Sequence, residues 1–257
     1  MISTRHLASA IACLGLLLLA PLASAAGKDT PAVIRTLEQK GLGNVQEFDA
    51  GPNLRGFAGV AGQQPIAVYV TPDGNAIVGS RVGADGSSLD EQRLHDLVAK
   101  PMGEAILAKL KASTWVQDGK SDAPRIIYTF SDPNCPYCNR FFQAARPWVD
   151  AGKVQLRHVM VGVIKADSST KAAAILTAKD RTAALLQNEH AFAAGGIDPA
   201  PGVPAGIRQQ LDANQALMSE LGFRGTPGIV YVDADGTVQR ANGMPQPEQL
   251  DAMMGPR

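Results

Sequence analysis

The sequence predicts a mixed α/β fold, α+β over the chain as a whole, from three observations. Apolar runs rich in strand-forming residues at 125–130 and 153–163 flank a stretch with helical spacing at 140–149. This strand–helix–strand order predicts two parallel strands connected by a helix. Two further stretches, at 65–82 and 228–240, each contain a pair of strand-like runs around a turn sequence and predict β-hairpins.

The first 25 residues have the features of a secretory signal peptide. Arg5 provides a short basic start, residues 7–20 are almost entirely apolar, and Ala23-Ser24-Ala25 is a small-residue cleavage signal. We therefore expect cleavage after Ala25, with an uncleaved membrane anchor as the alternative. Cys13 lies inside the apolar run rather than at its end, which argues against lipidation.

The composition of the remaining chain excludes several classes of protein. Removing 25 of the 257 residues leaves 232, which suits one large domain or two smaller ones. The remaining formal charge of −1 is not basic enough for nucleic-acid binding, and no later segment is apolar for long enough to span a bilayer. Only Cys135 and Cys138 remain as cysteines, so a network of disulfides does not hold the fold.

Residues 26–88 are predicted to form a small α+β unit. The segment 30–40 reads as a helix, with Thr30 as N-cap and Pro31 in the first helical position, and the hairpin at 65–82 follows. A unit of this size has a marginal core, so pairing with a second copy would stabilise it.

Residues 89–114 are predicted to form a connector helix. Apolar side chains share faces at helical spacing, but Pro101 interrupts the pattern, so we expect a kinked or broken helix. Such a helix fixes the distance between two domains better than a flexible linker. The second domain then spans 115–257, with an Ala-rich, mostly helical stretch at 167–222.

The sequence Cys135-Pro136-Tyr137-Cys138 directly follows the strand at 125–130. A structural zinc site usually needs four ligands, and the other candidate ligands are three histidines without paired spacing, His95, His158 and His190. A c-type haem requires histidine where Asn139 stands. A structural disulfide across so small a loop removes little chain entropy. We therefore favour a redox pair, with the structural disulfide and the zinc site as alternatives.

The local sequence assigns different environments to the two thiols. Pro136 suits the first helical position, which makes Cys135 the expected N-cap, with its sulfur facing the free N–H groups of the first turn. These donors favour the thiolate, and we expect its pKa in the range of roughly 3.5–7.5 known for such sites. Cys138 lies one turn further on and should be more buried and less ionised. Cys135 would then attack a substrate sulfur, and Cys138 would resolve the mixed disulfide.

Two motifs carry a resemblance to a known family. The stretch Phe130 to Cys138 has the pattern F-x-D-P-x-C-x-Y-C, and Thr226-Pro227 follows much later in the chain. With them the sequence resembles the periplasmic disulfide isomerases of the DsbC/DsbG family, thioredoxin-fold proteins of Gram-negative bacteria. Proline rather than glycine at 136 tilts the resemblance towards the DsbG members.

The resemblance implies an architecture and an activity. It implies a cystatin-like dimerisation domain at 26–88, a connector helix at 89–114, and a thioredoxin-fold redox domain with a helical insertion at 115–257. It further implies a V-shaped periplasmic homodimer that is kept reduced by the membrane reductase DsbD. Such a protein isomerises or reduces wrong disulfides of unfolded or misoxidised exported proteins and reduces sulfenic acids on their single cysteines.

The resemblance also implies which residues form the site. Cys135 and Cys138 would be catalytic and would form the redox-active disulfide, without a metal or other cofactor. Pro136, Tyr137, Thr226 and Pro227 would contact the substrate, and Pro227 would be cis. A proline at a strand start leaves the preceding backbone free to pair with a substrate chain. We interpret the nearby aromatic residues and histidine as structural, namely Phe141, Phe142, Trp148 and His158; Asp132 and Arg140 flank the site.

Two other functions fit the sequence less well. A DsbA-like dithiol oxidase would use the same cysteines, but a monomeric oxidant has no need of a pairing domain. A holdase chaperone would bind unfolded chains while its cysteines remained incidental.

Overall fold

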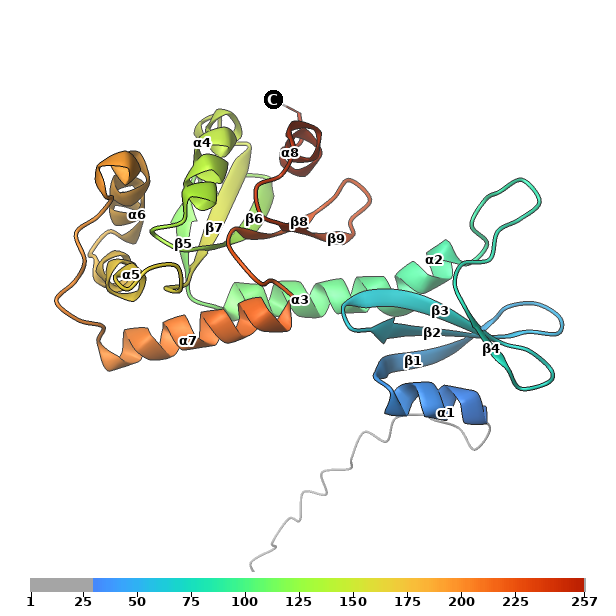
Figure 1. Cartoon of the computed structure of the whole chain (residues 1–257). Helices are drawn as coiled ribbons and strands as arrows, with labels where there is room; N and C mark the ends of the chain where they lie inside the picture. The colour runs from blue at the N-terminus through green and yellow to red at the C-terminus, as the bar shows by residue number, and fades with distance from the viewer. Residues whose placement is uncertain (1–29, 257) are drawn as a thin grey trace, which may run out of the picture.

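The computed structural model describes residues 30–256, which form two β-sheets joined by a long helix (Figure 1). One sheet has the strand order β1-β2-β3-β4 and the other the order β5-β7-β6-β8-β9. The predicted signal peptide, with Cys13, lies outside the described residues. None of the described helices is long and apolar enough to cross a membrane.

The first sheet is antiparallel throughout. Its elements are α1 (Ala32–Gln39), β1 (Leu42–Asp49), β2 (Arg55–Ala61), β3 (Gln64–Val70) and β4 (Ala76–Val78). The β3–β4 pair confirms the predicted hairpin. The helix starts one residue later than predicted, because Pro31 rather than Thr30 occupies the cap position.

The sequence did not predict β1 and β2, because glycines hide their alternation. A Cβ at Gly56 would lie 2.5 Å from the ring of Phe48, and a Cβ at Gly59 would lie 2.8 Å from Leu42. Both large side chains come from β1 and lie across β2. β2 therefore has glycine at two positions where a strand pattern would have a side chain.

Both faces of the first sheet are covered. Ile34 of α1 packs with Phe57 and Val68 on one face. On the other face Val98 of the connector helix packs with Phe48 and Tyr69. The first sheet therefore completes its core only with part of the connector.

The connector is helical from Glu91 to Ala112 and is not broken. It consists of α2 (Glu91–Leu94), a π turn η1 (His95–Ala99) and α3 (Lys100–Ala112). The wide π turn ends just before Pro101, which has no N–H to donate. Of the segment predicted as a kinked or broken connector helix at 89–114, Glu91–Ala112 is helical, with a π turn as its irregularity.

The second sheet contains the predicted parallel unit. Its strands are β5 (Trp115–Asp118), β6 (Arg125–Ser131), β7 (Val154–Met160), β8 (Gly228–Val232) and β9 (Val238–Asn242). β6 and β7 are parallel, and α4 (Pro136–Asp150) connects them, while β8 and β9 form the predicted antiparallel hairpin. β5 was not predicted as a strand; it is a four-residue edge strand antiparallel to β7.

Helices cover both faces and one edge of this sheet (Figure 1). They are α5 (Ser168–Thr177), α6 (Arg181–His190), a 3₁₀ turn η2 (Phe192–Ala194), α7 (Ala205–Glu220) and α8 (Pro247–Met254). α4 and α8 pack on one face, around residues that include Phe141 and Trp148. α3 and α7 pack on the other face, and α5 and α6 extend the core beyond β5. Phe141, Phe142 and Trp148 are buried, as predicted.

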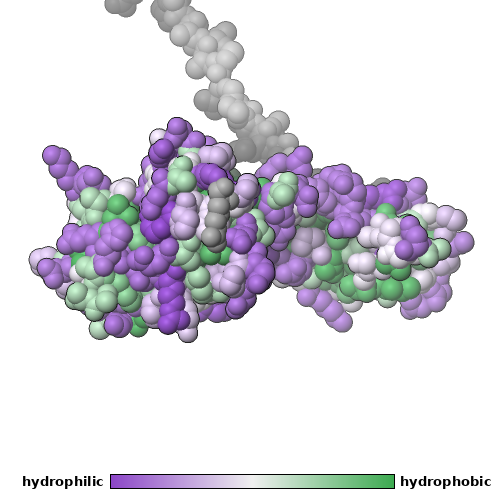
Figure 2. Space-filling model, turned by 90° about the horizontal axis from the view of Figure 1, so that it is seen from above, coloured by the Kyte–Doolittle hydropathy of each residue, from purple (hydrophilic) through white to green (hydrophobic). Residues whose placement is uncertain are grey.

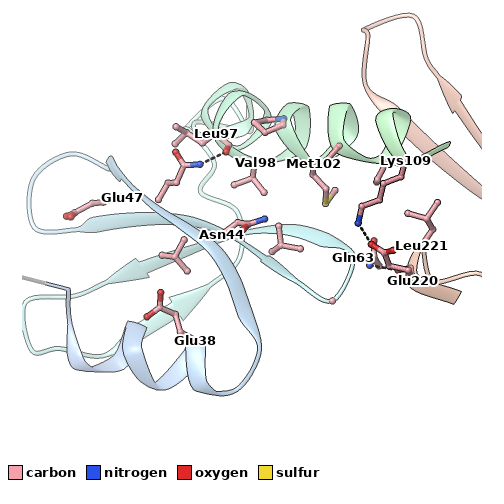
Figure 3. Close-up of a pocket in the computed structure, with 17 residues that line it drawn as sticks. Glu38, Asn44, Glu47, Gln63, Leu97, Val98, Met102, Lys109, Glu220 and Leu221 are labelled. Carbon is pink, nitrogen blue, oxygen red and sulfur yellow. Dashed lines mark hydrogen bonds and ion pairs between the residues drawn. The ribbon is translucent and has the colours of Figure 1, made fainter. Parts of the chain in front are cut away.

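The two sheets also touch beside the connector. Arg240 of β9 donates to the Oε1 of Gln63, at the tip of the β2–β3 hairpin, over 2.6 Å. Lys109 of α3 pairs with Glu220 of α7 at the rim of a cavity of about 1020 Å³ (Figure 3). Polar contacts thus add to the helix in setting how the second sheet lies relative to the first.

Candidate active site

The cysteine pair lies where α4 begins, directly after β6. Cys135 is the N-cap residue, with φ −83° and ψ 113°, and Pro136 follows inside the helix. The Cys138 backbone N–H donates to Cys135 Sγ over 3.2 Å. The predicted cap is therefore present, with sulfur in the place of the usual oxygen acceptor.

A tight turn holds Cys135 in this position. The Cys135 N–H donates to the carbonyl oxygen of Asp132 over 3.0 Å, which brings the two residues within the roughly 7 Å span of a β-turn. The Asp132 side chain is buried, at 1 % exposed. Its Oδ1 accepts from Asn134 N and Ser168 Oγ at 2.9 and 2.7 Å, and its Oδ2 from the amides of Val163 and Ile164 at 2.6 and 2.9 Å. One carboxylate therefore joins the turn to α5 and to the loop after β7.

The helical insertion adds further contacts to the same turn. Asn134 donates to Asp167 Oδ1 over 2.9 Å and accepts from the buried Nζ of Lys171 over 3.0 Å, both at α5. Asn188 of α6 donates to the Pro133 carbonyl over 3.1 Å. The backbone that carries Cys135 is thus held from the outside by side chains of two inserted helices.

The Thr226–Pro227 bond is cis, and β8 begins at the next residue. When it is protonated, the Cys135 thiol donates to the Thr226 carbonyl oxygen over 3.3 Å. The Thr226 hydroxyl is buried and has no hydrogen-bond partner within the described part of the chain, so it is available to either sulfur.

Hydrogen bonds give the two thiols opposite pKa shifts. The pKa of Cys135 falls to about 6, mainly because the Cys138 thiol donates to its thiolate; burial opposes this, and the Thr226 hydroxyl and the amides of Cys138 and Tyr137 add to it. The pKa of Cys138 rises well above its usual range, first through burial and then through the thiol bond to Cys135 and its negative charge. The value for Cys135 lies inside the predicted range. At neutral pH the pair is one thiolate and one thiol.

The two cysteines are shielded from solvent to a similar degree, although burial acts more strongly on the pKa of Cys138, as expected. Cys135 is 2 % exposed and Cys138 4 %, because the turn and the Thr226–Pro227 loop cover the first sulfur as well. Hydrogen bonding and local desolvation, rather than solvent exposure of the residue, therefore separate their ionisation. Both cysteines are free thiols, so the predicted redox-active disulfide is not formed in this structure.

The residues expected to contact substrate differ in accessibility. Tyr137 is 52 % exposed, with the guanidinium of Arg140 over its ring at 5.3 Å. Pro136 is exposed, Thr226 is partly buried and Pro227 is buried. Substrate contact at these four residues stays a prediction.

Sequence reasoning missed two exposed apolar residues beside this site. Val163 and Ile164 are 40 % and 46 % exposed, and their amides bind the Asp132 carboxylate three residues before Cys135. The signal was present in the sequence, because the apolar run that forms β7 continues past the end of the strand.

His158 belongs to a buried polar cluster behind the site. Its Nδ1 lies 3.2 Å from Ser131 Oγ and its Nε2 3.4 Å from Asp118 Oδ2, while Asp118 pairs with Arg146. These contacts join β5, β6, β7 and α4, which agrees with the structural role predicted for His158. The described residues contain no group of three or more side chains suited to a metal ion.

Comparisons with known proteins agree with this geometry. Residues 116–255 match the family model of the thioredoxin-like domain. Over 245 residues the chain is 45 % identical to the thiol:disulfide interchange protein DsbG of Pseudomonas aeruginosa, which covers 95 % of this chain and 96 % of that protein. The chain belongs to the DsbG family. The DsbG of Escherichia coli is 40 % identical over 246 residues, covering 93 % of this chain and 98 % of that protein.

Membership of the DsbG family identifies the chain as a thiol–disulfide oxidoreductase with a thioredoxin fold, as predicted. The matched domain begins at β5, the strand that the sequence pattern missed. Among solved structures, the catalytic domain of Proteus mirabilis ScsC aligns with a TM-score of 0.49 and 20 % identity, over 59 % of this chain and 93 % of that one.

The reduced protein should show one thiol that ionises near pH 6. Ultraviolet thiolate absorbance should have a midpoint of about 6 that disappears in Cys135→Ser. The pKa of Cys135 in the folded protein lies below its unfolded value of about 8.5. The thiolate therefore stabilises the reduced fold fully above a pH of about 8.5, and this stabilisation is lost as the pH falls through 6. The unfolding free energy of wild type minus that of Cys135→Ser should therefore shrink by about 1 kcal/mol for each unit that the pH is lowered across this window. A midpoint near 8.5 would contradict the cap.

Removing the Asp132 carboxylate should destabilise the protein and loosen the turn. Asp132→Ala leaves three amides and a hydroxyl without their acceptor, at a cost of about 3 kcal/mol. Asp132→Asn keeps one acceptor and should lose less. The exposed Asp122→Ala serves as control, with an effect below about 0.5 kcal/mol. Denaturant unfolding measures the loss, and wild-type stability of Asp132→Ala would refute the role of the carboxylate.

Proposed function

We propose that this protein is a periplasmic reductase and isomerase of wrong disulfides in exported proteins, with Cys135 as nucleophile and Cys138 as resolving thiol. The observation that carries the proposal is the opposite pKa shift of two hydrogen-bonded cysteines at the start of α4. A thiolate at neutral pH is the reactive form in thiol–disulfide exchange.

The electrons can follow two routes after the first step. The Cys135 thiolate attacks one sulfur of a substrate disulfide, and the other sulfur leaves as a thiolate and takes a proton from water. If Cys138 then attacks Cys135, the substrate leaves reduced, and its two electrons have come from the Cys135–Cys138 pair, which becomes a disulfide. If another substrate thiol attacks instead, the substrate disulfide is rearranged and the enzyme returns reduced.

The site provides a physical reason for the order of these steps. While Cys135 is a thiolate, its charge and its hydrogen bond keep Cys138 protonated. Formation of the mixed disulfide removes that charge, and with it a cause of the raised pKa of Cys138. The Asp132 amide and the Thr226 hydroxyl, which both act to lower this pKa, then favour the Cys138 thiolate. The resolving thiol is therefore activated by capture of a substrate.

Single oxidised cysteines fit the same chemistry. The Cys135 thiolate condenses with a sulfenic acid, whose hydroxyl leaves as water after protonation, and a mixed disulfide results. Cys138 resolves this product as before. A substrate chain would contact the exposed side chains of Pro136, Tyr137, Val163 and Ile164 around the site, and the chain at Thr226 and Pro227.

We further propose the division of the chain into a dimerisation domain at 26–88, a connector helix at 89–114 and a redox domain at 115–257. The short strand β4 lies at the edge of the first sheet, and large apolar side chains are exposed on and after it, namely Ile77 and Val78 at 57 %, Val82 at 63 % and Leu89 at 49 %. Apolar surface also gathers over this part of the molecule, at the right of Figure 2. A second copy of the chain would cover this edge by extending the sheet and burying these side chains.

The proposal includes a location and a source of electrons. The predicted signal peptide at 1–25 would direct the chain to the periplasm and be cleaved there. The membrane reductase DsbD would return the Cys135–Cys138 disulfide to the dithiol. A DsbA-like oxidase would instead hold the pair oxidised at steady state, and a holdase chaperone would keep its activity without either cysteine.

A Cys138→Ala variant should trap substrates covalently. Without the resolving thiol the mixed disulfide at Cys135 persists, so complexes with exported proteins should appear on non-reducing gels and vanish with reductant. Cys135→Ala is the matched control and should trap none. Equal trapping by both variants would contradict the assigned roles, and full biological activity of the double alanine variant would favour a holdase.

Charges on the edge strand should separate the dimer. Ile77→Lys with Val78→Lys should convert a dimer to monomers in sedimentation experiments, because two lysines on an edge strand oppose pairing. Ile126→Lys changes an exposed isoleucine of the second sheet and should leave the dimer intact. A wild-type monomer, or a dimer that survives both lysines, would refute this interface.

A further inference from the structure

One face of the central strand β6 is left open at the end far from the cysteines. Phe130, Tyr128 and Ile126 alternate along β6 and therefore point to the same face. Their exposed fractions rise from 0 % to 4 % to 37 %. Helices α3 and α7 cover Phe130 and Tyr128, but their cover ends before Ile126. Ile126 pairs with Gln155 of β7, whereas the pairing of β6 with β8 begins only at Tyr128, so this end of β6 is also open on one side.

A cavity of about 820 Å³ occupies this open end. Ile126 and Tyr128 contribute to its lining from β6, Leu107 from α3, Val232 from β8 and Met254 from α8. The volume lies within the range of small-molecule sites, about 300–1,000 Å³. The lining is recessed between a helix and the sheet, which suits a narrow apolar chain better than a flat partner surface.

Cations surround this apolar lining. Lys111, Arg125, Lys153 and Arg157 line the cavity, and Asp233 is the one acidic side chain among the lining residues within 30–256. Arg157 donates to the Tyr128 hydroxyl over 2.6 Å and lies over the Trp115 ring at 4.3 Å. Arg125 donates to the backbone carbonyls of Val232 and Met253 over 3.2 and 3.3 Å. These acceptors are neutral, so the rim keeps an excess of positive charge.

We propose that this cavity binds a single-chain anionic amphiphile, such as a fatty acid. The acyl chain lies on Ile126, Tyr128 and Leu107, and the carboxylate lies among Lys111 and Lys153 at the rim. An apolar chain gains by leaving water, and the charged head pairs with the lysines. The cavity opens at the start of β6, while Cys135 follows the strand's other end, about 20 Å away. The site is thus separate from the redox chemistry.

Calorimetric titration of the full-length reduced protein with laurate, below its micelle concentration, tests the proposal. We expect saturable binding of one laurate per chain, and weaker binding of dodecyltrimethylammonium, which has a similar chain and the opposite charge. Lys111→Glu with Lys153→Glu should weaken laurate binding by about tenfold or more, because both head-group partners are reversed. Ile126→Asp, which places a carboxylate beneath the chain, should weaken it as strongly.

A charge-matched control separates the cavity from the overall charge of the protein. Lys40→Glu with Lys100→Glu reverses two exposed lysines outside the cavity and should leave laurate affinity within about twofold of wild type. The proposal is overturned if laurate does not saturate, if the cation binds equally well, or if both lysine pairs have the same effect. Binding of an acidic peptide or of anionic vesicles at this rim without laurate binding would overturn it as well.

Discussion

The pairing of the Cys138 thiol and amide with the Cys135 sulfur is the interaction on which the chemistry of this protein depends. It exists because β6 ends in a tight turn and α4 begins at Pro136, so that a sulfur takes the cap position of a helix. The thiol of the second cysteine lowers the pKa of Cys135 most, and its amide adds to that effect. Each cysteine thereby shifts the pKa of the other, so a change of bonding at one sulfur changes the pKa of its neighbour.

The turn that places Cys135 at the cap position requires the burial of several polar and charged side chains. Four buried polar or charged residues surround it, namely Asp132, Asn134, Lys171 and Asn188. Such residues stabilise a fold only when their partners are well placed. Their partners come from helices inserted between β7 and β8. The insertion therefore does more than extend the apolar core beyond β5. It supplies the polar groups that keep the redox turn in one conformation, which apolar packing alone would specify less well.

The sequence predicts the elements whose signals are local. The parallel unit, both hairpins, the cap at Cys135 and the buried aromatic residues of α4 all follow from spacing or from the chemistry of neighbouring residues. Strands β1 and β2 did not follow, because Gly56 and Gly59 make room for side chains of another strand. The role of Asp132 was equally hidden, since Ser168 lies far along the chain and only the fold brings them together. The burial of Cys135 was missed for the same reason: the Thr226 loop that covers it comes from a remote segment.

The connector helix has a place in both hydrophobic cores. Val98 packs against the first sheet, and Ile106 and Leu110, about two and three turns further along, pack against the second. Neither sheet keeps its full core if this helix comes loose. Heat or denaturant that frees the helix from one sheet exposes apolar surface on which the other also relies, so the two halves lose their structure in a shared cooperative transition.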